Sequence, residues 1–188
     1  MRMASAICLL GSLVLVVTPA YSQVHGFPGP LTAAGEGGNA QVQGRLVGEF
    51  SGFAGSDDNA SSLVTGLRRG GDITLVSAPG QPPETVNFTP ATRPMGYGNV
   101  RIALSLARVQ LAQNGITQPT PDQLRAALAG GVVANGTGNP GSTTRLQGVL
   151  QMRADGMGWG RIAQSMGVKL GPVMSGRANV QGPVAPSS

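Results

Sequence analysis

The chain has 188 residues and a formal net charge of +5, yet only 11% of its residues are charged and 4% are aromatic. Its 30 glycines and 14 prolines are many for a globular protein but too few for a wholly disordered one. A single histidine and a single cysteine exclude most metal clusters and any disulfide framework. This length allows one domain or two small ones.

Residues 1–22 have the layout of a secretory signal peptide. Arg2 supplies a positive charge, residues 6–17 form an uncharged apolar run, and small residues follow at Ala20 and Ser22. The apolar run is shorter than the ~20 residues that span a bilayer. We therefore expect cleavage after Ser22, no membrane span, and an exported protein that is periplasmic or secreted.

Residues 23–55 are rich in glycine, proline, alanine and glutamine, which predicts a disordered leader. If cleavage follows Ser22, the mature chain begins at Gln23 and carries His25 at its third position. The terminal amine, two backbone amides and the imidazole can then form a square-planar site for Cu(II) or Ni(II). Cyclisation of Gln23 would remove the amine from that site. No cofactor is expected.

Residues 56–172 carry the periodic segments, which predict one small α+β domain that is predominantly helical. A helix is expected over 57–69, with an aspartate at its start as the cap. Alternating apolar residues at 72–77 and 85–89 flank a stretch rich in proline and glycine. This pattern predicts a single β-hairpin.

The second half of this domain reads as a series of helices. The widest apolar stripe lies in a helix predicted over 99–113, which should contact neighbours on two sides. Residues 120–123 form a capping box with a proline at the first helical position, so a helix begins there. Further helices are expected at 143–154 and around 162–166, and residues 173–188 at the end of the chain read as a disordered tail.

Charge is divided unevenly along the mature chain. Residues 23–92 hold three arginines and six acidic residues, whereas residues 93–188 hold eight arginines, one lysine and two acidic residues. The basic half suggests an anionic partner, such as an envelope component, although a basic surface also serves solubility alone. Arg101 and Arg108 are seven residues apart on one predicted helix, which makes them candidate partner-binding residues.

Trp159 is the only tryptophan and lies between two glycines. In a chain with so few rings we expect it to fill the core between two helices. The alternative is an exposed platform on which a sugar or a partner stacks, so Trp159 is also a candidate for partner binding.

Two motifs that would indicate an enzyme are incomplete. Residues 136–141 match the glycine fingerprint of dinucleotide-binding folds, but no second strand ending in an acidic residue follows. We therefore expect a surface loop there. A catalytic triad needs a positioned histidine, and His25 lies in the predicted leader. No enzymatic activity is expected.

The segment 149–168 joins a helix, a glycine turn and the string IAQSMGV. It resembles the first two helices of helix-turn-helix DNA-binding modules, in which a third helix reads the major groove. Here the glycines and prolines that follow disfavour a long third helix. Nucleic acid is also not the expected partner of an exported chain.

The mature chain as a whole also resembles a group of small exported proteobacterial proteins of no established function. The shared strings are SLVTGLR (62–68), MGYGNVRIALSLA (95–107), PTPDQL (119–124) and GMGWGRIAQSMGVKLG (156–171). This resemblance implies export and the extent of the domain, but no activity. The sequence thus favours an exported noncatalytic binding or structural protein of the bacterial envelope. The alternative is a helix-turn-helix-like nucleic-acid-binding protein, which requires that residues 1–22 are not a signal peptide.

Overall fold

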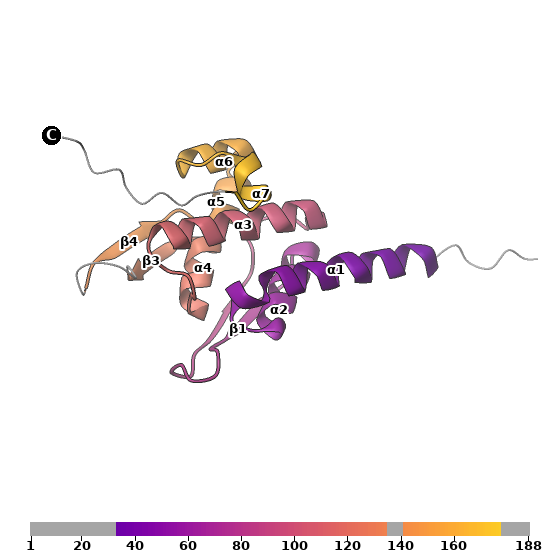
Figure 1. The fold of residues 1–188 in the computed structure, drawn as a ribbon, viewed down its shortest axis with the longest axis horizontal. Coiled ribbons are helices and arrows are strands. Elements are labelled where there is room, and N and C mark those ends of the chain that lie inside the picture. The colour runs from indigo at the N-terminus through magenta and orange to yellow at the C-terminus, as the bar shows by residue number, and fades with distance from the viewer. Residues whose placement is uncertain (1–32, 135–140, 178–188) are drawn as a thin grey trace, which may run out of the picture. The chain divides into compact units, whose positions relative to one another are not determined.

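The computed structural model describes residues 33–134 and 141–177 (Figure 1). The predicted signal peptide, the metal site at Gln23 and His25, and nearly all of the glycine fingerprint lie outside these residues, as do residues 178–188.

The described residues form seven helices and four strands, and the expected class, α+β and mainly helical, is confirmed. In chain order the elements are α1 (Ala33–Ala54), α2 (Asp57–Arg69), β1 (Ile73–Val76), β2 (Thr85–Phe88), α3 (Tyr97–Gln113), α4 (Pro121–Ala129), β3 (Gly131–Ala134), β4 (Thr143–Leu146), α5 (Val149–Ala154), α6 (Trp159–Ser165) and α7 (Leu170–Met174).

Helix α1 corrects the prediction of a disordered leader over 23–55, because residues 33–54 are helical. Leu46, Phe50 and Phe53 recur at helical spacing, and all three are buried. Helix α1 packs along α2 and also contacts α3. Helix α1 contains six glycines, and glycine is a poor helix former, so the sequence did not predict a helix here despite its short apolar face. Tertiary packing therefore outweighs local propensity here.

Helix α2 and the first hairpin occur where the sequence predicted them. The cap of α2 is Ser56 rather than an aspartate, and its side chain accepts a hydrogen bond from the Asn59 backbone N–H. Asn59 itself is buried, and its Nδ2 donates to the carbonyls of Ala54 and Val76, at 2.8 Å each. Its Oδ1 accepts the Val76 N–H at 2.9 Å. One side chain thus joins the end of α1 and strand β1 to α2.

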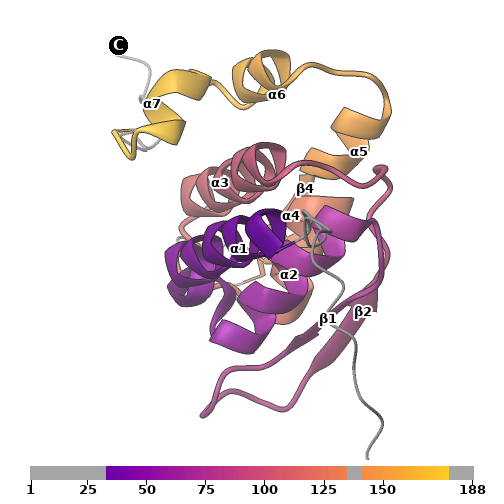
Figure 2. The ribbon, with the colours of Figure 1, turned by 90° about the vertical axis from the view of Figure 1, so that its right-hand side faces the viewer.

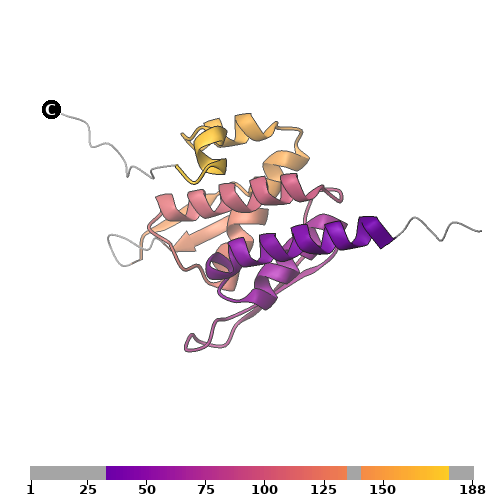
Figure 3. The same cartoon turned by 45° about the vertical axis from the view of Figure 1, so that its right-hand side comes forward.

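Helix α3 is central to the packing. It contacts α1, α2, α4, α5 and α7, as its wide apolar stripe predicted. Figure 3 shows α3 between α1 on one side and α6 and α7 on the other. Its leucines Leu104, Leu106 and Leu111 are fully buried.

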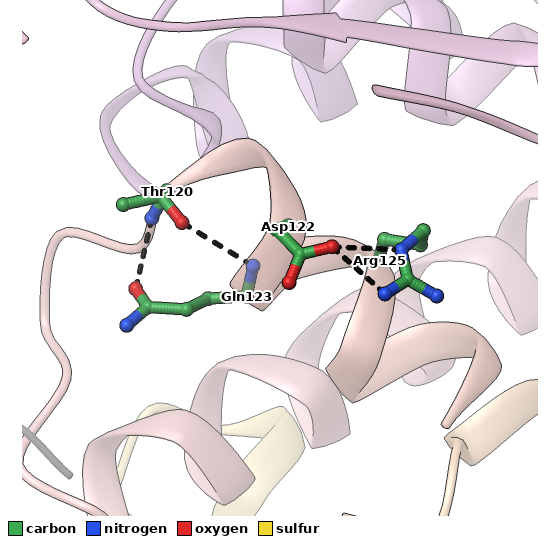
Figure 4. Close-up of polar contacts among 4 residues, drawn as sticks. All are labelled: Thr120, Asp122, Gln123 and Arg125. Atoms are coloured by element: carbon green, nitrogen blue, oxygen red, sulfur yellow. Dashed lines mark hydrogen bonds and ion pairs between the residues drawn. The ribbon is translucent and has the colours of Figure 1, made fainter. Parts of the chain in front are cut away.

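The capping box predicted for α4 is present (Figure 4). Thr120 Oγ1 accepts the Gln123 N–H, and Gln123 Oε1 accepts the Thr120 N–H. Asp122, in the first turn of the same helix, forms an ion pair with Arg125 at 2.7 Å. Local sequence therefore fixes where this helix begins.

A second hairpin corrects the prediction of a single one. Strand β3 pairs antiparallel with β4, with Val133 opposite Thr144, so the helix expected from residue 143 begins only at Val149. The β-branched residues of β4 favour a strand, and burial of Val133 and Leu146 gives the hairpin an inner face. Gly148 then allows α5 to start very close to the end of α4.

The domain also extends beyond its predicted end at residue 172. Helix α7 runs to Met174, and Val173 is only 4% exposed because it packs in the core. The predicted tail therefore starts too early.

In the two described stretches, none of the helices is long and apolar enough to cross a bilayer.

Candidate functional site

A cleft of about 590 Å³ lies where α5 and α6 meet the start of α3. One wall is the segment 91–96 together with Asn99 in the first turn of α3. The other wall comes from the end of α5, the turn after it, and Trp159 at the start of α6. Figure 2 shows the chain leading into α3 running close to α5. We refer to this hollow as the Trp159 cleft.

Trp159 is half-buried and combines features of both sequence interpretations. It packs against the hydrophobic core, and its indole Nε1 donates to Asn99 Oδ1 at 3.0 Å. The same side chain lines the cleft. The expectation that Trp159 fills the core therefore holds in part, because the indole packs against the core while part of it stays accessible.

Arg153, in the last turn of α5, lies against this indole. Its guanidinium carbon is 5.1 Å from the centre of the Trp159 ring, a cation–π contact. Its Nη1 also donates to the Met157 carbonyl at 3.0 Å. Two contacts therefore hold the guanidinium at the wall of the cleft, so less side-chain entropy is lost when it binds a ligand.

Arg93 and Thr92 lie on the opposite wall. Arg93 is exposed and, across the described residues, has neither a hydrogen bond nor an ion pair from its guanidinium, so it is free to bind a ligand. The Thr92 hydroxyl oxygen is buried and, within the part of the chain that the structure describes, has no hydrogen-bond partner. A buried polar atom without a partner is costly to the fold, and this oxygen is enclosed by the protein rather than open to a ligand.

The cleft is positively charged. Arg93 and Arg153 line it, and no acidic side chain among residues 33–134 and 141–177 does so. Asp155 lies close in sequence, but it is exposed and accepts a hydrogen bond from Gln151 at 3.0 Å. The arrangement suits an anion with additional polar groups. Sequence reasoning missed Arg93, Arg153 and Thr92, since only the fold brings the segment 91–96 to the end of α5.

Arg101 and Arg108, the predicted partner-binding arginines, lie outside this cleft. Arg101 donates to Glu49 of α1 at 2.8 Å, and this hydrogen bond raises the pKa of Arg101 above its usual range. Both side chains are partly exposed, at 42% and 30%, so the pair stabilises the fold by only about 0.5 kcal/mol. Arg108 lies over the Phe50 ring at 5.4 Å. Both arginines of α3 thus contact side chains of α1.

Helices α5 and α6 occupy the positions that the helix-turn-helix resemblance gave to its first two helices. The next helix, α7, has five residues, two of which are Gly171 and Pro172. It is shorter than a helix that follows the major groove.

In the described ranges no group of three histidine, cysteine, aspartate or glutamate side chains could hold a metal ion. Comparisons with protein-family models, with curated proteins and with solved structures found no match. We therefore infer function from the geometry and charge of the Trp159 cleft.

Proposed function

We propose that this chain is an exported, noncatalytic binding protein of the bacterial envelope that takes a small anionic ligand in the Trp159 cleft. The observation that supports this most is the lining of the cleft, which has two guanidinium groups and no carboxylate among the described residues. A volume of about 590 Å³ is within the range of small-molecule sites.

Export rests on the signal-peptide layout of residues 1–22. Mass spectrometry of the protein recovered from the periplasm or medium of a bacterial host tests it. The expected mature chain begins at Gln23, and a chain retained in the cytoplasm with its first residues intact would contradict export.

Anion binding is tested on the mature chain with inorganic phosphate as the probe. Because Trp159 is the only tryptophan and lines the cleft, its fluorescence should change saturably with phosphate. Replacing both Arg93 and Arg153 with Gln should weaken binding at least about ten-fold, since hydrogen bonds to charged groups contribute about 1.5–3 kcal/mol each.

The matched control replaces Arg45 and Arg161 with Gln, which lowers the net charge equally at two exposed arginines outside the cleft. The control should bind phosphate as the parent does. Equal losses in both double variants would show that general charge, and not the cleft, attracts the anion. If the protein bound duplex DNA and not phosphate, the helix-turn-helix alternative would be favoured.

A further inference from the structure

We infer that the ligand of the Trp159 cleft carries a phosphate monoester on a small polyhydroxylated group, rather than a single carboxylate. This inference rests on the proposed anion-binding function. It adds the chemical class of the anion and of the group that bears it.

The charge of the lining favours a doubly charged anion. A phosphate monoester carries about −1.5 to −2 charges at pH 7, which matches the guanidinium groups of Arg93 and Arg153. A carboxylate carries one charge and would leave one of these cations without a counter-charge. Guanidinium groups also bind phosphate oxygens with two parallel N–H donors.

The lining offers more donors than one carboxylate accepts. Asn99 Oδ1 is occupied by the indole N–H of Trp159, which turns the amide so that Nδ2 is its remaining polar atom. Gly96, the N-cap of α3, also lines the cleft, and no side chain caps this helix. Its first backbone N–H groups therefore add positive potential at the same wall. Three phosphate oxygens can accept hydrogen bonds from this larger set.

The size and remaining lining of the cleft point to an organic group joined to the phosphate. A volume of about 590 Å³ is far larger than one phosphate needs. The indole of Trp159 offers an apolar surface, and Asn99 Nδ2 can donate to a ligand hydroxyl. A sugar or polyol presents both an apolar face and several hydroxyls. The source of such a ligand is either a soluble sugar phosphate or a lipid with a phosphate monoester headgroup.

Calorimetric titration of the mature chain with glucose 6-phosphate, glucuronate and glucose tests the inference. Glucuronate carries a carboxylate at the end of the sugar where glucose 6-phosphate carries its phosphate ester. The difference between the two affinities therefore reports on the anionic group rather than on the sugar ring. We expect glucose 6-phosphate to bind at least about ten-fold more tightly than glucuronate, the size of one charge-assisted hydrogen bond. Affinity for glucose 6-phosphate should fall at least about ten-fold in Arg153→Gln and stay unchanged in Arg161→Gln.

A pH series gives an independent readout. As the pH falls through about 6, the phosphate monoester loses its second negative charge. Among the described residues, the cleft is lined by no histidine and no carboxylate that would change charge over the same range. Affinity for glucose 6-phosphate should therefore fall several-fold between pH 7 and pH 5, while any affinity for glucuronate should not.

Vesicles distinguish the two sources. Retention on phosphatidylcholine vesicles containing phosphatidic acid, but not on those containing phosphatidylglycerol, would place the monoester on a lipid. Binding of glucose 6-phosphate without such retention would place it on a soluble sugar.

Equal or tighter binding of glucuronate would overturn the phosphate inference and leave anion binding standing. Binding of inorganic phosphate alone, with neither glucose 6-phosphate nor phosphatidic acid bound, would overturn the polyhydroxylated group. If no anion bound, both this inference and the proposed function would fall.

Discussion

The indole Nε1 of Trp159 donates to Asn99 Oδ1 at 3.0 Å and so joins the start of α6 to the first turn of α3, 60 residues earlier. This bond holds the tryptophan at the boundary between the core and the cleft. The side chain therefore both stabilises the fold and lines the candidate site. Substitutions of Trp159 measure the first of these roles.

Trp159→Ala should destabilise the protein by about 2–4 kcal/mol, less than a fully buried ring would, because Trp159 is half-buried. Trp159→Phe keeps an aromatic ring but loses the hydrogen bond, which should cost about 1 kcal/mol. Urea denaturation measures the stability of both variants.

In the parent, tryptophan emission should lie between that of buried and of exposed indoles, with partial quenching by iodide. Water-like emission with an unchanged stability of Trp159→Ala would contradict the contacts described.

Helix α1 should be essential to folding. Leu46, Phe50 and Phe53 are buried, and burial of such side chains contributes about 1.5–3 kcal/mol each. Their sum is comparable to the whole stability of a small domain, about 5–15 kcal/mol. A chain that begins at Gly55 should therefore unfold without cooperativity in thermal denaturation followed by circular dichroism.

Point variants check the same helix without removing it. Phe50→Ala should cost about 3–5 kcal/mol, because Phe50 is fully buried. Val42→Ala, at a site 39% exposed on the same helix, should cost less than about 0.5 kcal/mol. Cooperative melting of the shortened chain near the parent's temperature would show that α1 is not part of the core.

Gly148 is expected to tolerate no side chain. A Cβ at this position would lie 2.3 Å from the carbonyl carbon of Ala129 and 2.3 Å from the Gly130 nitrogen, so backbone must move. Gly148→Ala should cost at least about 2–3 kcal/mol, at the upper end of overpacking effects. Gly160→Ala is the control, since a Cβ there meets nothing within 4 Å. It should be neutral or stabilising by up to about 1 kcal/mol. Similar melting temperatures for the two variants would refute the close approach of α5 to α4.

Thr92→Val separates binding from stability. The Thr92 hydroxyl oxygen is buried and, in the described residues, unpartnered, so removing it should stabilise the free protein by about 1 kcal/mol. The same change should leave the affinity for glucose 6-phosphate unchanged, because the enclosed oxygen is not open to the cleft. Urea denaturation and calorimetric titration measure the two quantities. A loss of stability in Thr92→Val would show that the hydroxyl has a partner within the fold, and a weakened affinity would show that it reaches the ligand.

Local chemistry explains which elements could be predicted. Helix α2 and the capping box at Thr120 were predictable because their signals lie within a few residues of each other. Helix α1 was missed because its face has few large apolar residues among glycines, and contacts with α2 and α3, which are distant in the sequence, stabilise it. Strand β4 was missed because its partner β3 precedes it across residues 135–140, so pairing rather than periodicity defines it.

The candidate site was predictable only in part. Trp159 stood out by composition, as the one tryptophan. Arg93 and Arg153 carried no local signal, because their role depends on the packing of α5 and α6 against the start of α3. Arg101 and Arg108 share a face as expected, but the sequence did not show that Glu49 and Phe50 of α1 would meet them there.

The most direct test of the Trp159 cleft is the nuclear magnetic resonance signal of the indole N–H. Since the chain has one tryptophan, its ¹⁵N-labelled form gives one such signal, from the group bonded to Asn99. Titration of the mature chain with glucose 6-phosphate should shift this signal saturably, with Arg161→Gln behaving as the parent and Arg153→Gln requiring at least about ten-fold more ligand for the same shift. A signal that stays in place up to millimolar ligand, or one that shifts equally in Arg153→Gln, would contradict anion binding in this cleft.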